Sequence, residues 1–136
     1  MIQDTGYRIL VERSNMSNYK KLDVWRMSHE LVLDIYKITV SFPKDELYSL
    51  TSQIRRASYS IPANIAEGYG RAHRKELLQF LNIAKGSASE LEYELMLARD
   101  LGYLSNEEYS KLDASVKTII KMLTGLSRSL RTQPII

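Results

Sequence analysis

Side chains that carry chemistry are scarce in this sequence. The chain of 136 residues has no cysteine and only two histidines, His29 and His73. The lack of cysteine excludes disulfides, cysteine-ligated zinc, iron–sulfur clusters and thiol catalysis. A di-metal centre in a helical bundle needs two Glu-x-x-His motifs, but Arg26 and Gly70 stand three residues before the histidines. We therefore expect no enzyme and no catalytic, cofactor-binding or metal-ligating residues, and a bundle metalloenzyme is the least favoured alternative.

Polar residues recur along one face of the segment around residues 50–67. They are spaced three or four apart, as on one side of a helix, and polar residues of the segment 86–94 have compatible spacing. One interpretation is a polar binding site between two helices. The other is a buried or half-buried network that fixes helix register, with an ion pair between Arg56 and Glu90. The network that we assign comprises Gln53, Arg56, Asn64, Glu67, Ser87 and Glu90, with Ser60 and Glu94 at other positions of the same faces.

The formal charge of +3 conceals an uneven distribution of charged residues. Residues 71–85 carry +3, residues 86–110 carry −5 and residues 111–136 carry +4. A row of basic side chains on one helix face is suited to contact nucleic-acid phosphates. The alternatives are an ordinary solvated face, or a complement to the acidic segment in a neighbouring subunit. The candidate contacts to RNA or DNA are Arg71, Arg74, Lys75, Lys117, Lys121 and Arg128.

Apolar periodicity predicts the first two of the helices that must position these side chains. Apolar residues recur every three or four positions over residues 23–42 and again over residues 47–65. Pro62 removes a helical hydrogen bond, so we expect a kink or a short break just before it. Gly68 and Gly70 should close the second helix in the left-handed conformation and begin the loop to the next helix.

The third and fourth helices have the clearest patterns. Seven apolar residues of the third helix form an unbroken heptad seam. Gly86 lies in its middle at a cost of about 1 kcal/mol, which favours close packing of a neighbour against the bare backbone. Gly102 should end this helix, and a capping box of Ser105 and Glu108 should start the fourth, whose seam continues to Leu130. The seven residues are Leu77, Leu81, Ala84, Ala88, Leu91, Leu95 and Ala98.

Four helices with short connections predict an all-α, antiparallel, up-down-up-down four-helix bundle over residues 21–130. We expect residues 1–20 to form a poorly ordered N-terminal extension, in which Met16 offers an alternative start, and residues 131–136 to form a C-terminal tail. The N-terminus lacks the order of a signal peptide. No apolar run approaches the ~20 residues of a membrane span. The expected protein is cytoplasmic and has no membrane partner.

The apolar and aromatic residues exceed what one four-helix core requires. The chain has nine tyrosines, a residue that is enriched at protein interfaces. Leu78, Ile83 and Leu97 lie off the main seam of the third helix. These residues favour self-association, although they would also suit the boundary positions of a monomer.

Several segments together resemble one known family, the bacterial four helix bundle proteins encoded in intervening sequences of large-subunit ribosomal RNA genes. The similarity covers about residues 20–128. The segments that carry it are Phe42-Pro43, ELYSLTSQIRRA from Glu46 to Ala57, SIPANIAEG from Ser60 to Gly68, FLNIAKGSASELE from Phe80 to Glu92, and LGYL from Leu101 to Leu104.

The resemblance implies an antiparallel four-helix bundle that assembles into a homopentameric ring, without enzymatic activity or cofactor. It suggests RNA association through the location of the family's genes. A related branch comprises the accessory proteins of diversity-generating retroelements, which bind nucleic acid and a reverse transcriptase. The expected function is therefore that of a homo-oligomeric scaffold, with a basic surface for RNA or DNA. The alternative is an adaptor for a protein such as a reverse transcriptase.

Overall fold

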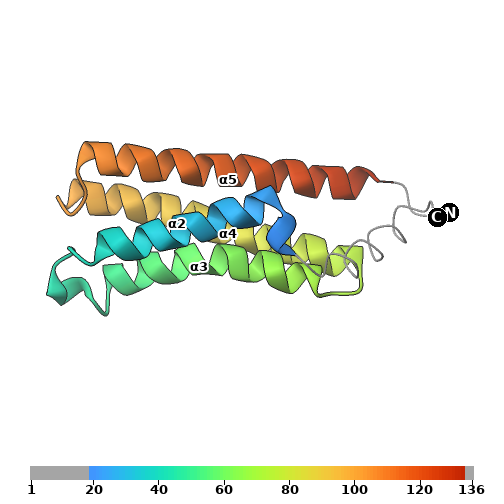
Figure 1. Cartoon of the computed structure of the whole chain (residues 1–136), viewed down its shortest axis with the longest axis horizontal. Helices are drawn as coiled ribbons and strands as arrows, with labels where there is room; N and C mark the ends of the chain where they lie inside the picture. Colours follow the sequence, from blue (N-terminus) through green and yellow to red (C-terminus); the bar gives the residue numbers. More distant parts are fainter. Residues whose placement is uncertain (1–18, 134–136) are drawn as a thin grey trace.

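The computed structural model describes residues 19–133, and within this range four α-helices run along the long axis of the molecule (Figure 1). No strand occurs in the described residues, so the predicted all-α four-helix bundle is confirmed. Residues 1–18 of the predicted extension and residues 134–136 of the predicted tail lie outside the described residues. The helices are α2 (Asp23–Thr39), α3 (Leu50–Tyr69), α4 (Arg74–Asp100) and α5 (Asn106–Thr132), with 3-10 turns η1 (Tyr19–Lys21) and η2 (Lys44–Glu46).

Each helix packs against two others and so completes the bundle. Helix α3 lies between α2 and α4, and α5 packs against both α4 and α2. Consecutive helices run in opposite directions, as the colours of Figure 1 show. The α3–α4 turn and the C-terminal end of α5 consequently lie at the same end of the molecule.

One apolar core holds the four helices together. The predicted seam of α4 is confirmed, since all seven of its residues have an exposed fraction of 0%. Buried residues of α2, α3 and α5 join the same cluster, among them Ile35, Ile54 and Ile119. In the part of the chain that the structure describes, no helix combines the length and the hydropathy needed to cross a membrane.

Two predicted helix boundaries are confirmed at the turn between α4 and α5. Gly102 has φ +85°, in the left-handed region that glycine adopts without steric cost. The Tyr103 N–H donates to the Ala98 carbonyl at 2.8 Å, which satisfies one of the last carbonyls of α4. At the start of α5, the Glu108 N–H donates to Ser105 Oγ and the Ser105 N–H donates to Glu108 Oε1, which forms the predicted capping box.

The prediction for the end of α3 is wrong in two respects. Helix α3 runs through Pro62 without a break, because a single missing hydrogen bond is outweighed by the packing of the rest of the helix, including the buried proline ring. It also continues to Tyr69, so Gly68 is a buried helical residue and does not begin the loop. Neither Gly68 nor the C-cap residue Gly70, at φ −87°, has the predicted left-handed conformation. The reason for glycine here is close packing, since a Cβ at position 68 would lie 3.0 Å from both Leu77 Cδ1 and Phe80 Cβ.

Candidate functional site

A small hydrogen-bonded group fixes the register between α3 and α4. The hydroxyls of Ser60 and Ser87 are 2.9 Å apart, a hydrogen bond that joins the two helices. Asn64 Nδ2 donates to the Ser60 carbonyl at 2.8 Å and to Ser60 Oγ at 3.0 Å. The buried alanines Ala57 and Ala84 leave room for the two backbones to approach. These contacts link part of the polar face that the sequence indicates.

The remaining members of the predicted network are not connected to this group. Arg56 and Glu90 are both exposed, and no ion pair joins them within residues 19–133. An ion pair between two exposed side chains of this kind would add little to the stability of the fold, because water solvates both charges. Glu67 instead accepts a hydrogen bond from Arg71 at 2.8 Å at the end of the same helix. Gln53 is exposed and lines a pocket together with Glu90.

This pocket lies between α3 and α4, near the connection from α2, and has a volume of about 520 Å³. Its lining includes three carboxylates, from Glu46, Glu90 and Glu94, and none of its described lining residues is basic. Tyr93 and Leu101 also line it, with 57% and 50% of their surface exposed. The pocket thus combines an uncompensated negative charge with an apolar rim.

Glu94 is the most unusual residue of this pocket. Only 7% of it is exposed, and within the described residues its Oε1 accepts no hydrogen bond. Burial, then the charge of Glu90 and a hydrogen bond with Glu90, together raise the pKa of this carboxyl to about 7. The sequence places Glu94 on the polar face of α4, but its position beside the seam residue Leu95 was the only signal of burial.

Glu46 shares the pocket but is fully engaged by its own chain. Its Oε2 accepts from Tyr103 Oη at 2.8 Å, and its Oε1 accepts from the Leu50 N–H at 3.3 Å. The hydrogen bond to Glu46 is the largest cause that raises the pKa of Tyr103. Glu90 and Glu94 therefore remain as the carboxylates available to a further ligand.

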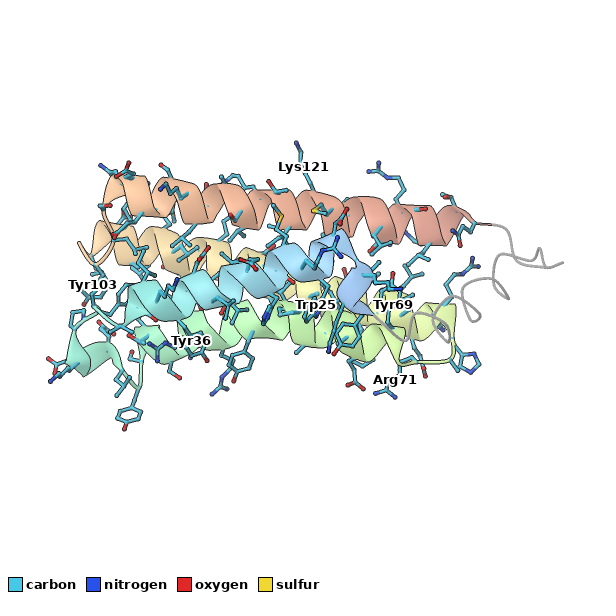
Figure 2. The ribbon with its side chains drawn as sticks, in the orientation of Figure 1. Trp25, Tyr36, Tyr69, Arg71, Tyr103 and Lys121 are labelled. Atoms are coloured by element: carbon cyan, nitrogen blue, oxygen red, sulfur yellow. The ribbon has the colours of Figure 1, made fainter. Side chains whose placement is uncertain are left out.

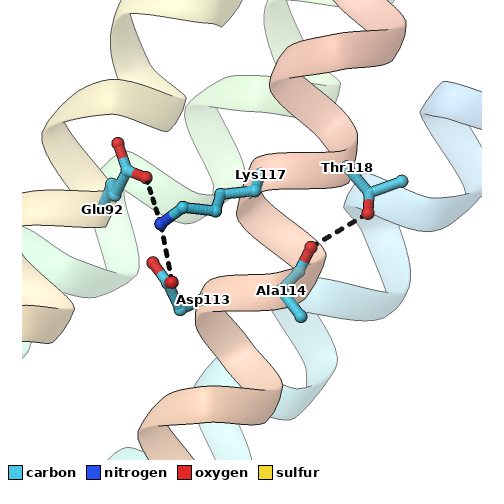
Figure 3. Close-up of polar contacts among 5 residues, drawn as sticks. All are labelled: Glu92, Asp113, Ala114, Lys117 and Thr118. Atoms are coloured by element: carbon cyan, nitrogen blue, oxygen red, sulfur yellow. Dashed lines mark hydrogen bonds and ion pairs between the residues drawn. The ribbon is translucent and has the colours of Figure 1, made fainter.

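The candidate phosphate contacts on α5 differ in how far their charge is neutralised. Lys117 Nζ donates to Asp113 Oδ2 at 2.7 Å and to Glu92 Oε2 at 2.9 Å (Figure 3). The hydrogen bonds to Asp113 and then Glu92 hold the pKa of Lys117 above its usual value. Lys121 and Arg128 are exposed and make no ion pair in the described structure, and Lys121 points away from the bundle (Figure 2).

The other three candidate contacts lie at the turn between α3 and α4. Arg71 pairs with Glu67 and also covers the Phe80 ring at 5.0 Å. Arg74 donates to the Gln133 carbonyl at 2.9 Å, which ties this turn to the end of α5. Lys75 is exposed, without an ion pair among residues 19–133. The structure thus brings the basic turn and the basic end of α5 to one end of the bundle.

Large exposed apolar side chains are distributed unevenly over the helices. In the described part of the chain they lie on α2, α3, α4 and the connections, and α5 has none. Gly86 lies on the exposed side of α4, and apart from its chain neighbours and the backbone of its own helix turn no atom of the described chain lies within 4 Å of the place where its Cβ would be. No neighbouring helix of the described chain therefore packs on Gly86. The exposed apolar residues are Leu33, Tyr36, Val40, Leu47, Tyr48, Tyr59, Ile83, Tyr93, Met96 and Leu101.

Comparison with known proteins gives a match to a family model and matches to solved structures. The model of the family described as 23S rRNA-intervening sequence protein matches residues 20–125. A crystal structure from Bacteroides thetaiotaomicron, of a protein with unknown function from the S23 ribosomal protein family, is 31% identical with a TM-score of 0.70. The match covers 76% of this chain and 97% of that chain. No curated protein matches.

Proposed function

The chain belongs to the 23S rRNA-intervening sequence protein family, and from this premise we propose that it is a non-enzymatic cytoplasmic scaffold that assembles with copies of itself. The proposed assembly is a ring of five chains, the number that the family resemblance implies. The basic surface of α5 and of the α3–α4 turn then faces outward, where it contacts the phosphates of RNA or DNA.

The observation that carries the self-association is that helices α2, α3 and α4 expose large apolar side chains, whereas α5 exposes none in the described chain. On α4 the exposed apolar side chains are Ile83, Tyr93 and Met96. Burial of such side chains against another protein removes apolar area from water, which is the main driving force of association. The exposed Gly86 supports the assignment of this side of α4 to the interface, since a partner helix can approach its bare backbone closely.

The polar character of α5 supports its assignment to the outside of the assembly. Its exposed side is formed by small, polar and basic residues, with Lys121 and Arg128 free of ion pairs in the described chain. The name of the family refers to ribosomal RNA. A polyanion is the ligand that such a surface attracts through its charge and not through a base-specific contact.

Replacement of Ile83 by aspartate tests the assembly surface. We expect light scattering to give about five times the 15.7 kDa chain mass for the wild type. I83D should shift the mass towards that of one chain, because it places a charge within the apolar interface. Thr118→Asp, at an exposed position of α5, is the matched control and should leave the assembly intact. An I83D protein with the wild-type mass would reject this surface.

A charge reversal on α5 tests the contact with nucleic acid. Fluorescence anisotropy with a structured RNA and a duplex DNA should show binding that weakens steeply with salt. The double variant K121E/R128E should weaken it at least about tenfold, because each phosphate contact contributes to affinity. Lys37→Glu, an equal change of charge per residue on α2, is the control. An assembled protein that binds no nucleic acid at low salt would contradict this role and leave the surface to a protein partner such as a reverse transcriptase.

A further inference from the structure

We propose that the pocket between α3 and α4 receives the ammonium or guanidinium group of a basic side chain from a second copy of this chain. The carboxylates of Glu90 and Glu94 supply the counter-charge. This inference rests on the proposed self-association, and it names a polar contact that would orient one copy on the next.

The charge of the pocket identifies a cation as the ligand. Three of its lining residues are acidic, and its described lining contains no lysine, arginine or histidine. Glu46 is satisfied by Tyr103 and by the Leu50 N–H, so its carboxylate stabilises the loop before α3. Glu90 and Glu94 have no basic partner within residues 19–133.

The burial of Glu94 is the independent sign that a partner is missing. A carboxylate that is 93% buried normally has a hydrogen-bonded or charged partner, because burial of an unpaired charge is costly. Here Oε1 is buried without a hydrogen-bond donor from the described chain. Glu92 on the same helix shows the contrast, since it lies on the side facing α5 and accepts from Lys117 at 2.9 Å.

The surroundings of the pocket favour a protein side chain over a metal ion. Within the described residues, no group of three or more acidic or histidine side chains is arranged to hold a metal. The rim instead carries the exposed apolar surfaces of Tyr93 and Leu101, which suit the aliphatic stem of a lysine or arginine. The same α4 side belongs to the proposed assembly surface, and this chain offers an exposed basic residue outside α5 that no acid of the described residues neutralises, Arg56 on α3.

The test compares isosteric neutral variants by sedimentation velocity over a range of concentrations. E90Q/E94Q should raise the concentration of half-dissociation at least about tenfold, because it leaves the incoming cation buried without counter-charge. E92Q removes an equally negative side chain from the other side of α4 and should change that concentration by less than about threefold. The single variant E90Q, at an exposed position, gives the same comparison without altering a buried residue.

The outcomes separate this inference from the proposed function. A wild-type chain that is monomeric at all concentrations overturns both. A wild-type assembly that E90Q/E94Q leaves unchanged or tightens overturns the pocket assignment alone. Calorimetric titration with spermidine tests a free amine as the occupant. Spermidine binding that E94Q abolishes, with assembly unaffected, would overturn the assignment to a second copy.

Discussion

At the level of single residues, Glu94 and Lys117 show that the surroundings of a charged side chain decide what it can do. Lys117 is exposed, yet two carboxylates of its own bundle neutralise it. Glu94 is buried, yet the described chain gives its Oε1 no donor. The first residue is therefore a weak candidate for phosphate contact, and the second is a strong candidate for an external cation.

The raised pKa of Glu94 predicts a pH-dependent stability of the isolated chain. Because its pKa rises from the ordinary 4.5 to about 7 in the folded chain, the folded state holds a proton between these pH values that the unfolded state has lost. Ionised Glu94 therefore lowers the free energy of unfolding most above pH 7, and this destabilisation disappears as the pH falls towards 4.5. E94Q should raise the free energy of unfolding at pH 8 by about 1–3 kcal/mol, and the gain should vanish near pH 4.

Urea denaturation at a protein concentration low enough to keep the chain monomeric measures this effect at each pH. E92Q provides the control. Glu92 is partly exposed to solvent and pairs with Lys117, so E92Q should not raise the free energy of unfolding at pH 8. A gain for E94Q that does not change between pH 4 and pH 8 would contradict the assignment of the raised pKa to Glu94.

At the level of elements, the α3–α4 pair shows which features a sequence can reveal. The seam of α4 could be predicted because its apolar residues repeat with the heptad period, and all of them are buried. The capping box and Gly102 could be predicted from local chemistry alone. The unbroken passage of α3 through Pro62 could not, because it depends on the burial of the ring among residues distant in sequence.

The predicted polar face of α3 and α4 indicated the positions of some residues but not the contacts of others. Its spacing correctly placed Ser60, Asn64 and Ser87 where two helices meet. The period of a helix does not specify how far each side chain extends, so the sequence could not exclude an ion pair of Arg56 with Glu90. It also could not reveal that Glu94 is buried, since that requires the neighbouring helix.

The close packing of Gly68 gives a prediction for the α3–α4 pair. G68A should lower the free energy of unfolding by about 1–3 kcal/mol, because the new methyl group would press on Leu77 and on Phe80 Cβ at 3.0 Å. Gly125→Ala on α5 is the matched control, where no described atom lies within 4 Å of the new Cβ. It should raise the free energy of unfolding by up to about 1 kcal/mol through helix propensity. Equal effects of the two variants in urea denaturation would contradict the packing role of Gly68.

At the level of the whole molecule, the two sides of the bundle differ in chemical character. Helices α2 to α4 expose large apolar side chains and the acidic pocket, whereas α5 exposes small, polar and basic residues. The net charge of +3 combines segments of opposite sign, since residues 86–110 carry −5 and the flanking segments 71–85 and 111–136 carry +3 and +4. A repeated head-to-tail contact among the exposed surfaces of α2, α3 and α4 closes into a ring when the rotation permits it, and α5 then lies on the outside of that ring.

Sedimentation equilibrium of the wild-type chain tests the central claim most directly. At micromolar concentration and physiological salt, the account predicts a single species with five times the chain mass of 15.7 kDa. A mass of one chain over the whole concentration range would contradict self-association. A stable dimer would contradict the ring.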